Sequence, residues 1–309
     1  MNKLIGIQEN LLETNAALAE LEKAIAKDPK SLSLAATAKS LEKRYQDLEA
    51  DFLAEADSLG VDVCAYRLFA EEGRPSVKAL SNVLGDFQNL VTTVYDAVKT
   101  AIPKTRARIS ADIASESEFQ FGYTFPGSVG VVLTIPNQRL LLGESHLDES
   151  LRLIFEMAKV YDSSVILEFA KRIGPASVRA LYKWAYDHAE SGLGADIEWR
   201  RKQNIRTRLF AQRPELQKLY HAISITSDEH TTELTLHGDL VGADVTRKTF
   251  HMKLVQGEDI RGSFTDAISE DLRVELPKRY KARIIKTEKI LYSTEEEITS
   301  YYLLELQSL

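Results

Sequence analysis

Cysteine and long apolar runs are scarce in this sequence. Cys64 is the only cysteine in 309 residues, which excludes an intrachain disulfide and a zinc site built from several cysteines. A single thiol is typical of a protein kept in a reducing compartment. No apolar run approaches the roughly 18 residues that a membrane span needs. Acids and amides also interrupt the apolar positions of the first residues, unlike in a signal peptide. We therefore predict a cytoplasmic protein that makes no contact with a membrane.

Charge of one sign does not dominate either. Lys and Arg number 39 against 46 Asp and Glu, and the net charge of −7 does not favour general coating of nucleic acid. Apolar residues are 44% and charged residues 28% of the chain, which excludes the disordered and fibrous classes. The length is about twice that of a typical domain, so two or three folding units are expected.

The first sixty residues carry the pattern of two helices. Apolar residues alternate spacings of three and four in two successive runs, as in the a/d seam of a coiled coil. Asp28 and Pro29 lie between the runs, where they are typical of the start of the second helix. We predict an antiparallel helical hairpin over 1–59. Its narrow apolar stripe buries too little to stand alone, so the hairpin either joins copies of the chain or packs on the rest of it. The stripe residues expected to join copies are Leu4, Ile7, Leu11, Leu18, Leu21, Ile25, Leu41, Leu48 and Phe52.

Residues 60–227 are predicted to form an α/β body followed by helices. The segment 118–125 alternates with period two and 129–135 is continuously apolar, so the first is expected to be half exposed and the second central. A turn at 126–128 would join them. A further strand is predicted at 61–69, and helices at 76–100, 147–161, 165–173, 176–190 and from Pro214 to near Ile225.

Residues 228–309 are predicted to form a small antiparallel β-barrel. Five or six short strands in about eighty residues have the scale of an OB-like or SH3-like barrel. The fold class is therefore α+β and multidomain: a helical hairpin of coiled-coil type, an α/β body with a helical extension, and the barrel. The strand candidates of the barrel are 232–240, 245–255, 259–264, 272–276, 279–292 and 300–307.

No residue pattern names a reaction. Cys64 lies mid-strand, where a small apolar filler is expected, and Ser128 lies in a turn between strands and not on a nucleophile elbow. His237, Asp239 and His251 could meet at one edge of the barrel. No catalytic residue, metal or cofactor is assigned. A nuclease-type carboxylate cluster would have to be built from Glu233, Asp239, Asp244 and Lys248. The spacing of these residues along the sequence does not indicate that they meet.

Positive charge gathers in two segments. Residues 199–213 hold six basic residues and no acid, and Arg201, Arg208 and Arg213 could share a face of a helix there. Residues 273–289 hold seven basic residues against two acids, with alternate cations along a strand. Such a strip, with Tyr280 and Tyr292 for stacking, would track a phosphate backbone. Alternatively, the cations pair with acids of the chain or form a solvated face. The candidate polyanion-binding residues are Arg200, Arg201, Lys202, Arg206, Arg208, Arg213, Lys278, Arg279, Lys281 and Arg283.

Two functions from different classes fit these patterns. The first is a non-enzymatic, self-associating binding module that engages nucleic acid, another polyanion or a partner protein through its basic surfaces. The second is a metal-dependent nuclease or other hydrolase with dispersed catalytic residues. Membership of a bacterial multi-protein system such as antiviral defence is an idea that no particular residue supports. The helical stripe and the absence of a catalytic motif favour the first, and we predict a homo-oligomer.

Overall fold

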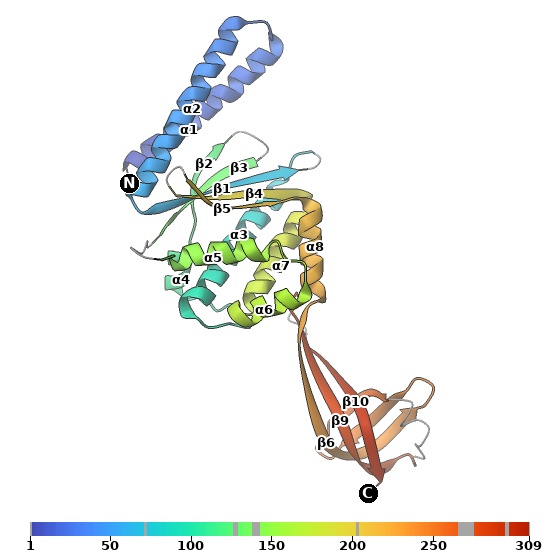
Figure 1. The fold of residues 1–309 in the computed structure, drawn as a ribbon. Coiled ribbons are helices and arrows are strands. Elements are labelled where there is room, and N and C mark those ends of the chain that lie inside the picture. Colours follow the sequence, from blue (N-terminus) through green and yellow to red (C-terminus); the bar gives the residue numbers. More distant parts are fainter. Residues whose placement is uncertain are drawn as a thin grey trace. The chain divides into compact units, whose positions relative to one another are not determined.

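The computed structural model describes residues 2–70, 73–125, 129–137, 143–201, 204–264, 275–293 and 297–308, which divide into two compact units, 1–223 and 224–309 (Figure 1). The described residues form eight helices and two sheets, so the predicted α+β class is confirmed, together with the N-terminal helix pair and the C-terminal barrel. Among the helices described, none is long and apolar enough to span a bilayer.

The helix pair consists of α1 (Asn2–Lys27) and α2 (Leu32–Ser58). Ser31 begins α2, since its hydroxyl accepts a hydrogen bond from the Leu34 amide at 3.4 Å. The expected cap at Asp28 is therefore wrong by three residues. The end of the pair remote from its turn packs on the sheet, where Phe52 and Tyr123 share one apolar cluster. The hairpin thus belongs to the first unit, and its turn end lies beyond the sheet (Figure 1).

The first sheet has the strand order β2-β3-β1-β4-β5, and every neighbouring pair is antiparallel. The body is therefore α+β and not the α/β arrangement that the sequence indicated. As expected, the strand at 129–136 lies inside the sheet and the one at 120–125 lies at its edge. The strands are β1 (Val61–Ala70), β2 (Gln120–Phe125), β3 (Val129–Pro136), β4 (Leu193–Arg201) and β5 (Asn204–Ala211). The predicted turn at 126–128 lies outside the described residues.

Strands β4 and β5 form a hairpin that the sequence analysis missed. The basic residues of 199–213 had indicated a helical face with Arg201, Arg208 and Arg213 on one side, and this prediction is wrong. Instead, alternate residues of β4 are buried because they point at the helices that cover the sheet, while their charged neighbours face outward. The buried residues are Leu193, Ala195, Ile197 and Trp199.

Helices cover one face of this sheet (Figure 1). Tyr66 of β1 points into this layer, where its hydroxyl accepts a hydrogen bond from Trp184 Nε1 at 2.8 Å and its ring packs on Phe87. The predicted helices are confirmed, although the one expected at 147–161 ends at Met157. The helices are α3 (Val77–Thr100), α4 (Ala111–Glu116), α5 (His146–Met157), α6 (Ser163–Ile173), α7 (Pro175–Glu190) and α8 (Arg213–Ile225).

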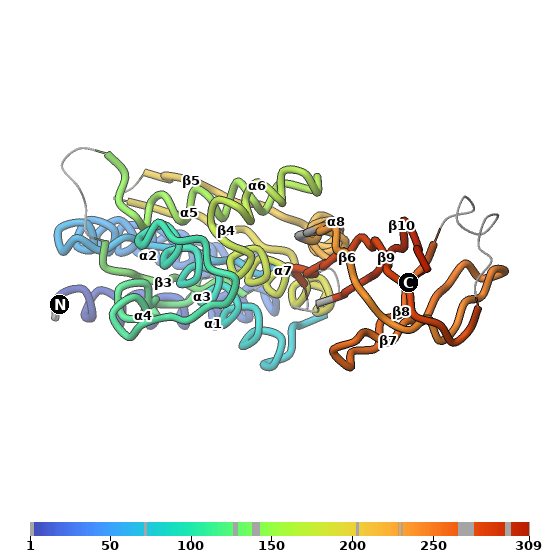
Figure 2. The backbone as a smooth tube through the Cα atoms, turned by 90° about the horizontal axis from the view of Figure 1, so that it is seen from below, coloured from blue at the N-terminus to red at the C-terminus, as the bar shows by residue number. Residues whose placement is uncertain are grey.

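The second unit is a closed five-stranded barrel with the order β10-β8-β7-β6-β9 (Figure 2). One pair, β8 with β10, is parallel, so the barrel is not wholly antiparallel as expected. This order, with its third and fifth strands parallel, is the connectivity of an OB-type barrel. The candidate strand at 272–276 lies mostly outside the described residues. The strands are β6 (Ser227–Asp244), β7 (Thr249–Leu254), β8 (Asp259–Phe264), β9 (Lys278–Leu291) and β10 (Glu297–Ser308).

Candidate functional site

The apolar stripe of the helical hairpin is covered at one end only. Near the sheet, Leu11 and Phe52 are fully buried, and the Phe52 ring lies edge-on to Tyr123 with centroids 5.0 Å apart. Beyond the sheet, Leu18 is still buried, but the stripe then becomes half-buried at Leu21, Ile25 and Leu41. Leu32, which begins α2 and lies outside the stripe, is 86% exposed. Of the predicted stripe, Leu4, Ile7, Leu11, Leu48 and Phe52 belong to the cluster on the sheet, and Leu18, Leu21, Ile25 and Leu41 lie toward the turn.

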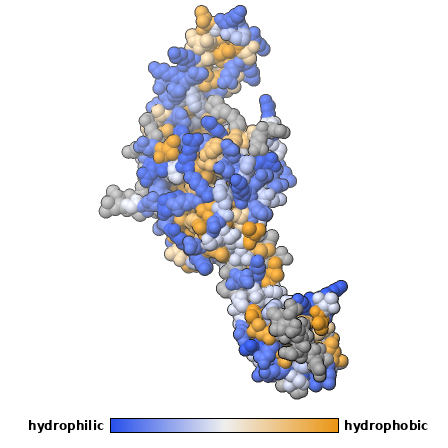
Figure 3. Space-filling view, turned by 45° about the vertical axis from the view of Figure 1, so that its right-hand side comes forward, coloured by the Kyte–Doolittle hydropathy of each residue, from blue (hydrophilic) through white to orange (hydrophobic). Residues whose placement is uncertain are grey.

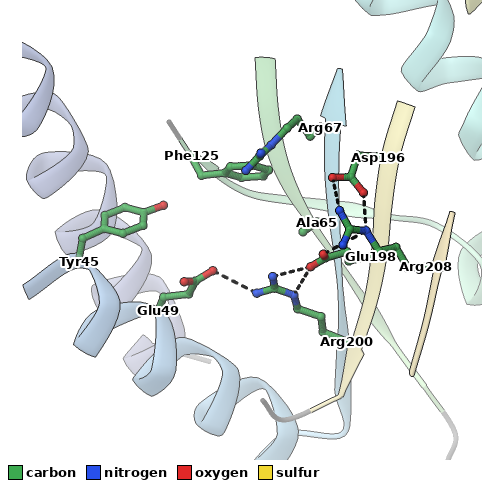
Figure 4. A pocket seen from close by; sticks show the side chains of 9 residues that line it. All are labelled: Tyr45, Glu49, Ala65, Arg67, Phe125, Asp196, Glu198, Arg200 and Arg208. Atoms are coloured by element: carbon green, nitrogen blue, oxygen red, sulfur yellow. Dashed lines mark hydrogen bonds and ion pairs between the residues drawn. The ribbon is translucent and has the colours of Figure 1, made fainter. Parts of the chain in front are cut away.

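A pocket of about 310 Å³ lies between α2 and the face of the sheet that the helical layer leaves open (Figure 4). The strand period of two puts alternate residues of β1 and β4 on this face, while Tyr66 and Trp199 point to the other. The pocket is polar, with three arginines and three carboxylates among its walls. Its lining residues are Tyr45, Glu49, Ala65, Arg67, Phe125, Asp196, Glu198, Arg200 and Arg208.

Five of the charged side chains form one continuous ion-paired chain. Arg208 binds both oxygens of Asp196 through Nε and Nη2, at 2.8 Å each. Arg200 donates to Glu198 Oε2 at 2.9 and 2.5 Å, and its Nη1 lies 3.3 Å from Glu49 Oε1. Arg208 Nε also lies 3.5 Å from Glu198 Oε1, which joins the two halves. The chain therefore contains three carboxylates and two guanidinium groups.

Arg67, the sixth charged group, stays outside this chain. The register places it opposite Asp196, but Arg208 already holds both oxygens of that carboxylate. The Arg67 guanidinium instead lies over the Phe125 ring, 5.2 Å from its centroid. Gly130 permits this position of the ring, because a Cβ atom there would overlap the Phe125 side chain. No carboxylate of the described residues pairs with Arg67.

Two further polar groups of the pocket have hydrogen-bonding capacity left over. The Tyr45 hydroxyl is screened from solvent and has no hydrogen-bond partner within the described ranges. Burial and, to a lesser degree, the charge of Glu49 raise the pKa of Tyr45, so the phenol stays protonated at neutral pH. Glu49 itself is held by the single 3.3 Å contact with Arg200. The pocket thus offers one unpaired cation, one hydroxyl and one lightly held carboxylate.

The predicted basic strip of 199–213 is largely ion-paired. Arg200 and Arg208 belong to the chain of the pocket. Arg201 points away from it and binds the buried Asp62 at 3.0 and 2.6 Å and Asp148 at 2.7 Å. Arg213 donates to the Ala189 carbonyl at 2.9 Å, Arg206 is exposed on β5, and Lys202 lies outside the described residues.

The cations of β9 do line one exposed face, as the alternation indicated, while Tyr280, Ala282 and Ile284 point into the barrel. Tyr280 and Tyr292 are both buried, so the prediction that they stack on bases is wrong. The second unit is acidic, with eleven Lys and Arg against sixteen Asp and Glu, a net charge of −5. The pairs on this face are Lys278–Glu275, Arg279–Asp239 and Arg283 with Glu233 and Glu305, whereas Lys281 has no carboxylate partner among the described residues.

The other candidate chemistry lies apart from the pocket. Asp239 binds Arg279, and His251 lies 3.6 Å from Asp259, so the proposed meeting of His237, Asp239 and His251 has no contact to support it. The described residues contain no cluster of three or more groups able to hold a metal ion. Cys64 is buried in β1, and burial raises the pKa of its thiol, which disfavours a thiolate. In the nuclease-type set, Glu233 pairs with Arg283, and Asp244 pairs with Arg247.

Two buried polar groups between β1, α3 and α7 were not foreseen. The Tyr66 hydroxyl lies 2.6 Å from His188 Nε2, and burial lowers the pKa of His188 to about 3. Nearby, burial and a hydrogen bond with Asp187 raise the pKa of Asp86 to about 6, while Lys183 lies 3.5 Å from Asp86. Both groups serve the helix layer and do not reach the pocket.

A scan against protein-family models found no match, and searches of curated proteins and of solved structures found no similar protein.

Proposed function

We propose that this protein is a non-enzymatic binding module whose copies associate through the turn end of the helical hairpin, residues 16–42. The observation that supports it is the incomplete cover of the apolar stripe there. Leu21, Ile25, Leu34 and Leu41 remain half-buried although the two helices already pack on each other, and Figure 3 shows apolar residues on the outer surface of this end. A second hairpin would remove these side chains from water, at about 25 cal/mol per Å² of apolar surface.

The charge of the hairpin supports a second copy as the occupant. Residues 16–42 contain four acidic and four basic residues, so two turn ends carry no net repulsion and can align opposite charges in an antiparallel pairing. The rest of the hairpin, residues 2–15 and 43–59, contains seven acids and three bases, and two such surfaces would repel. Eight alanines in 16–42 also allow close approach of helices.

The test is multi-angle light scattering of the full chain at two concentrations, beside a variant in which residues 16–42 are replaced by a short glycine-rich turn. Deleting 1–59 would be a poor choice, because it uncovers Tyr123 and Val132 on the sheet. We expect the parent protein to be an oligomer and the shortened variant a monomer, with Lys43→Ala, at an exposed position of α2 outside residues 16–42, as the control. A monomeric parent at both concentrations, or a shortened variant that still associates, contradicts the proposal.

A polyanion is the partner that the exposed cations of β9 favour. Most cations of the strip of 199–213 and of β9 are paired or hydrogen-bonded. Arg206 in the first unit and Lys281 in the second have no carboxylate partner in the described part of the chain. The prediction is a gel shift of short DNA or RNA that weakens with salt and is lost in an Arg206→Glu/Lys281→Glu variant. A shift unchanged by this double reversal contradicts it.

A further inference from the structure

The pocket between α2 and the open sheet face has an unpaired cation on one wall and a lightly held carboxylate on the opposite wall. Arg67 projects from β1 without a carboxylate partner in the described ranges, and Glu49 projects from α2 with one 3.3 Å contact (Figure 4). We propose that this pocket binds a small zwitterion of the α-amino acid type, with the ligand carboxylate on Arg67 and the ligand ammonium group on Glu49. This inference does not depend on self-association, because the pocket lies at the sheet and not at the turn end of the hairpin.

Arg67 is positioned to receive a carboxylate. One face of its guanidinium is held by the Phe125 ring, which restricts the side chain while leaving the N–H edge available. A planar guanidinium binds a carboxylate through two parallel hydrogen bonds, and such charge-assisted bonds are among the strongest in proteins. Asp196 does not compete, since both its oxygens are bonded to Arg208.

The rest of the lining favours a positive group on the same ligand. The ion-paired chain from Glu49 to Asp196 has one carboxylate more than it has guanidinium groups, so its surplus charge is −1, opposite to that of Arg67. A simple anion would be repelled by this surplus negative charge, and a simple cation would be repelled by Arg67. A dipolar ligand satisfies both, and it leaves the pocket neutral after binding.

The remaining walls fit a small molecule of this kind. The volume of about 310 Å³ is at the lower end of the range of small-molecule sites and accommodates one amino acid with its side chain. Phe125 and the small Ala65 provide the apolar part of the lining.

The experiment is isothermal titration calorimetry of the full chain with each of the twenty common L-amino acids. The strongest ligand is then compared with its carboxamide and its N-acetyl derivative, each of which removes one charge. Two variants, Arg67→Gln and Glu49→Gln, remove the two partners while keeping side-chain volume. The matched controls are Arg44→Gln and Asp47→Asn, which change one charge of the same sign at exposed positions of α2 outside the pocket.

We expect at least one amino acid to bind. Its dissociation constant should rise by about tenfold or more in each pocket variant and for each blocked derivative, which is the usual effect of losing a charge-assisted hydrogen bond. The two controls should bind as the parent does. Circular dichroism of the variants checks that they fold.

Three results overturn the inference. No amino acid binds; or a blocked derivative binds as well as the zwitterion; or binding survives both pocket substitutions. Self-association is also measured on the Arg67→Gln variant and should be unchanged, because the pocket and the turn end of the hairpin are different surfaces. A failure of ligand binding is thereby distinguished from a failure of the hairpin proposal.

Discussion

Arg201 is expected to act as a structural ion-pair partner, and its removal should strongly destabilise the first unit. Its guanidinium makes two bonds to Asp62, at 3.0 and 2.6 Å, and one to Asp148, at 2.7 Å. Asp62 has no exposed surface, and Asn137 donates to it at 2.7 Å. Burial opposes the ionisation of Asp148, but the hydrogen bonds and charge of Arg201 outweigh it and lower the pKa of Asp148. Loss of Arg201 would leave two adjacent carboxylates without their cation.

The magnitude follows from this geometry. Breaking a buried ion pair by removing one partner costs about 3–5 kcal/mol. The Arg201 side chain keeps 19% of its surface exposed, so the lower value, about 3 kcal/mol, is expected for Arg201→Met. With a denaturant slope of about 3 kcal/mol per M of urea, the unfolding midpoint should fall by about 1 M.

Tryptophan fluorescence during urea unfolding is the assay, because Trp184 and Trp199, the two tryptophans of the chain, both belong to the first unit. The control is Arg206→Met, an exposed arginine on β5, which should shift the free energy of unfolding by less than about 0.5 kcal/mol. Asp62→Asn/Asp148→Asn added to Arg201→Met should restore part of the loss. A drop below about 1 kcal/mol for Arg201→Met would refute the structural role and return this residue to the candidates for polyanion binding.

Two further predictions concern pH and backbone packing. The pKa of Asp86 is about 6 in the folded chain, above the ordinary value of 3.8, so the folded state binds more protons between these values and its stability falls as the pH rises from about 4 to about 6. Asp86→Asn should therefore raise the free energy of unfolding at pH 7 by about 1–2 kcal/mol after allowance for solvent screening, with little gain at pH 4. Urea titrations at both pH values measure this difference. Equal effects at the two pH values would contradict the raised pKa of Asp86. Gly262→Ala places a Cβ atom against the Tyr301 carbonyl where β8 meets β10, and should lower barrel stability by about 1–3 kcal/mol in thermal unfolding followed by circular dichroism. Gly242→Ala, whose Cβ would meet only the His251 side chain at 3.7 Å, is the control, and similar melting of the two variants would argue against the close strand contact.

Local signals predicted those elements whose partners are near in sequence. Ser145 caps α5 and Pro175 begins α7, both with standard helix-start chemistry, and the broad apolar face of α3 predicted its burial. The β4–β5 hairpin was missed because its outward residues are charged and its inward ones include small alanines. The apolar alternation there is weaker than the run of basic residues that suggested a helix.

The pocket was beyond local prediction for a different reason. Its lining comes from α2, β1, β2, β4 and β5, so residues 45 and 208 meet only after the sheet has formed. The one local trace is the alternation of Asp196, Glu198 and Arg200, which places three charges on one face of a strand. Arg67 and Arg208 both lie within reach of Asp196, and Arg208 is the one that pairs with it. The spacing of residues along the sequence does not predict which of two arginines binds a carboxylate.

The parallel contact between β8 and β10 has a consequence for the order in which the protein is made. β10 pairs with β9 along most of its length and with β8 at Tyr302 and Leu303, so this one strand closes the barrel. During synthesis the first unit can form once residue 223 has left the ribosome, whereas the barrel must wait as an open sheet until residue 303 emerges. The two units should therefore fold one after the other, with the N-terminal unit leading.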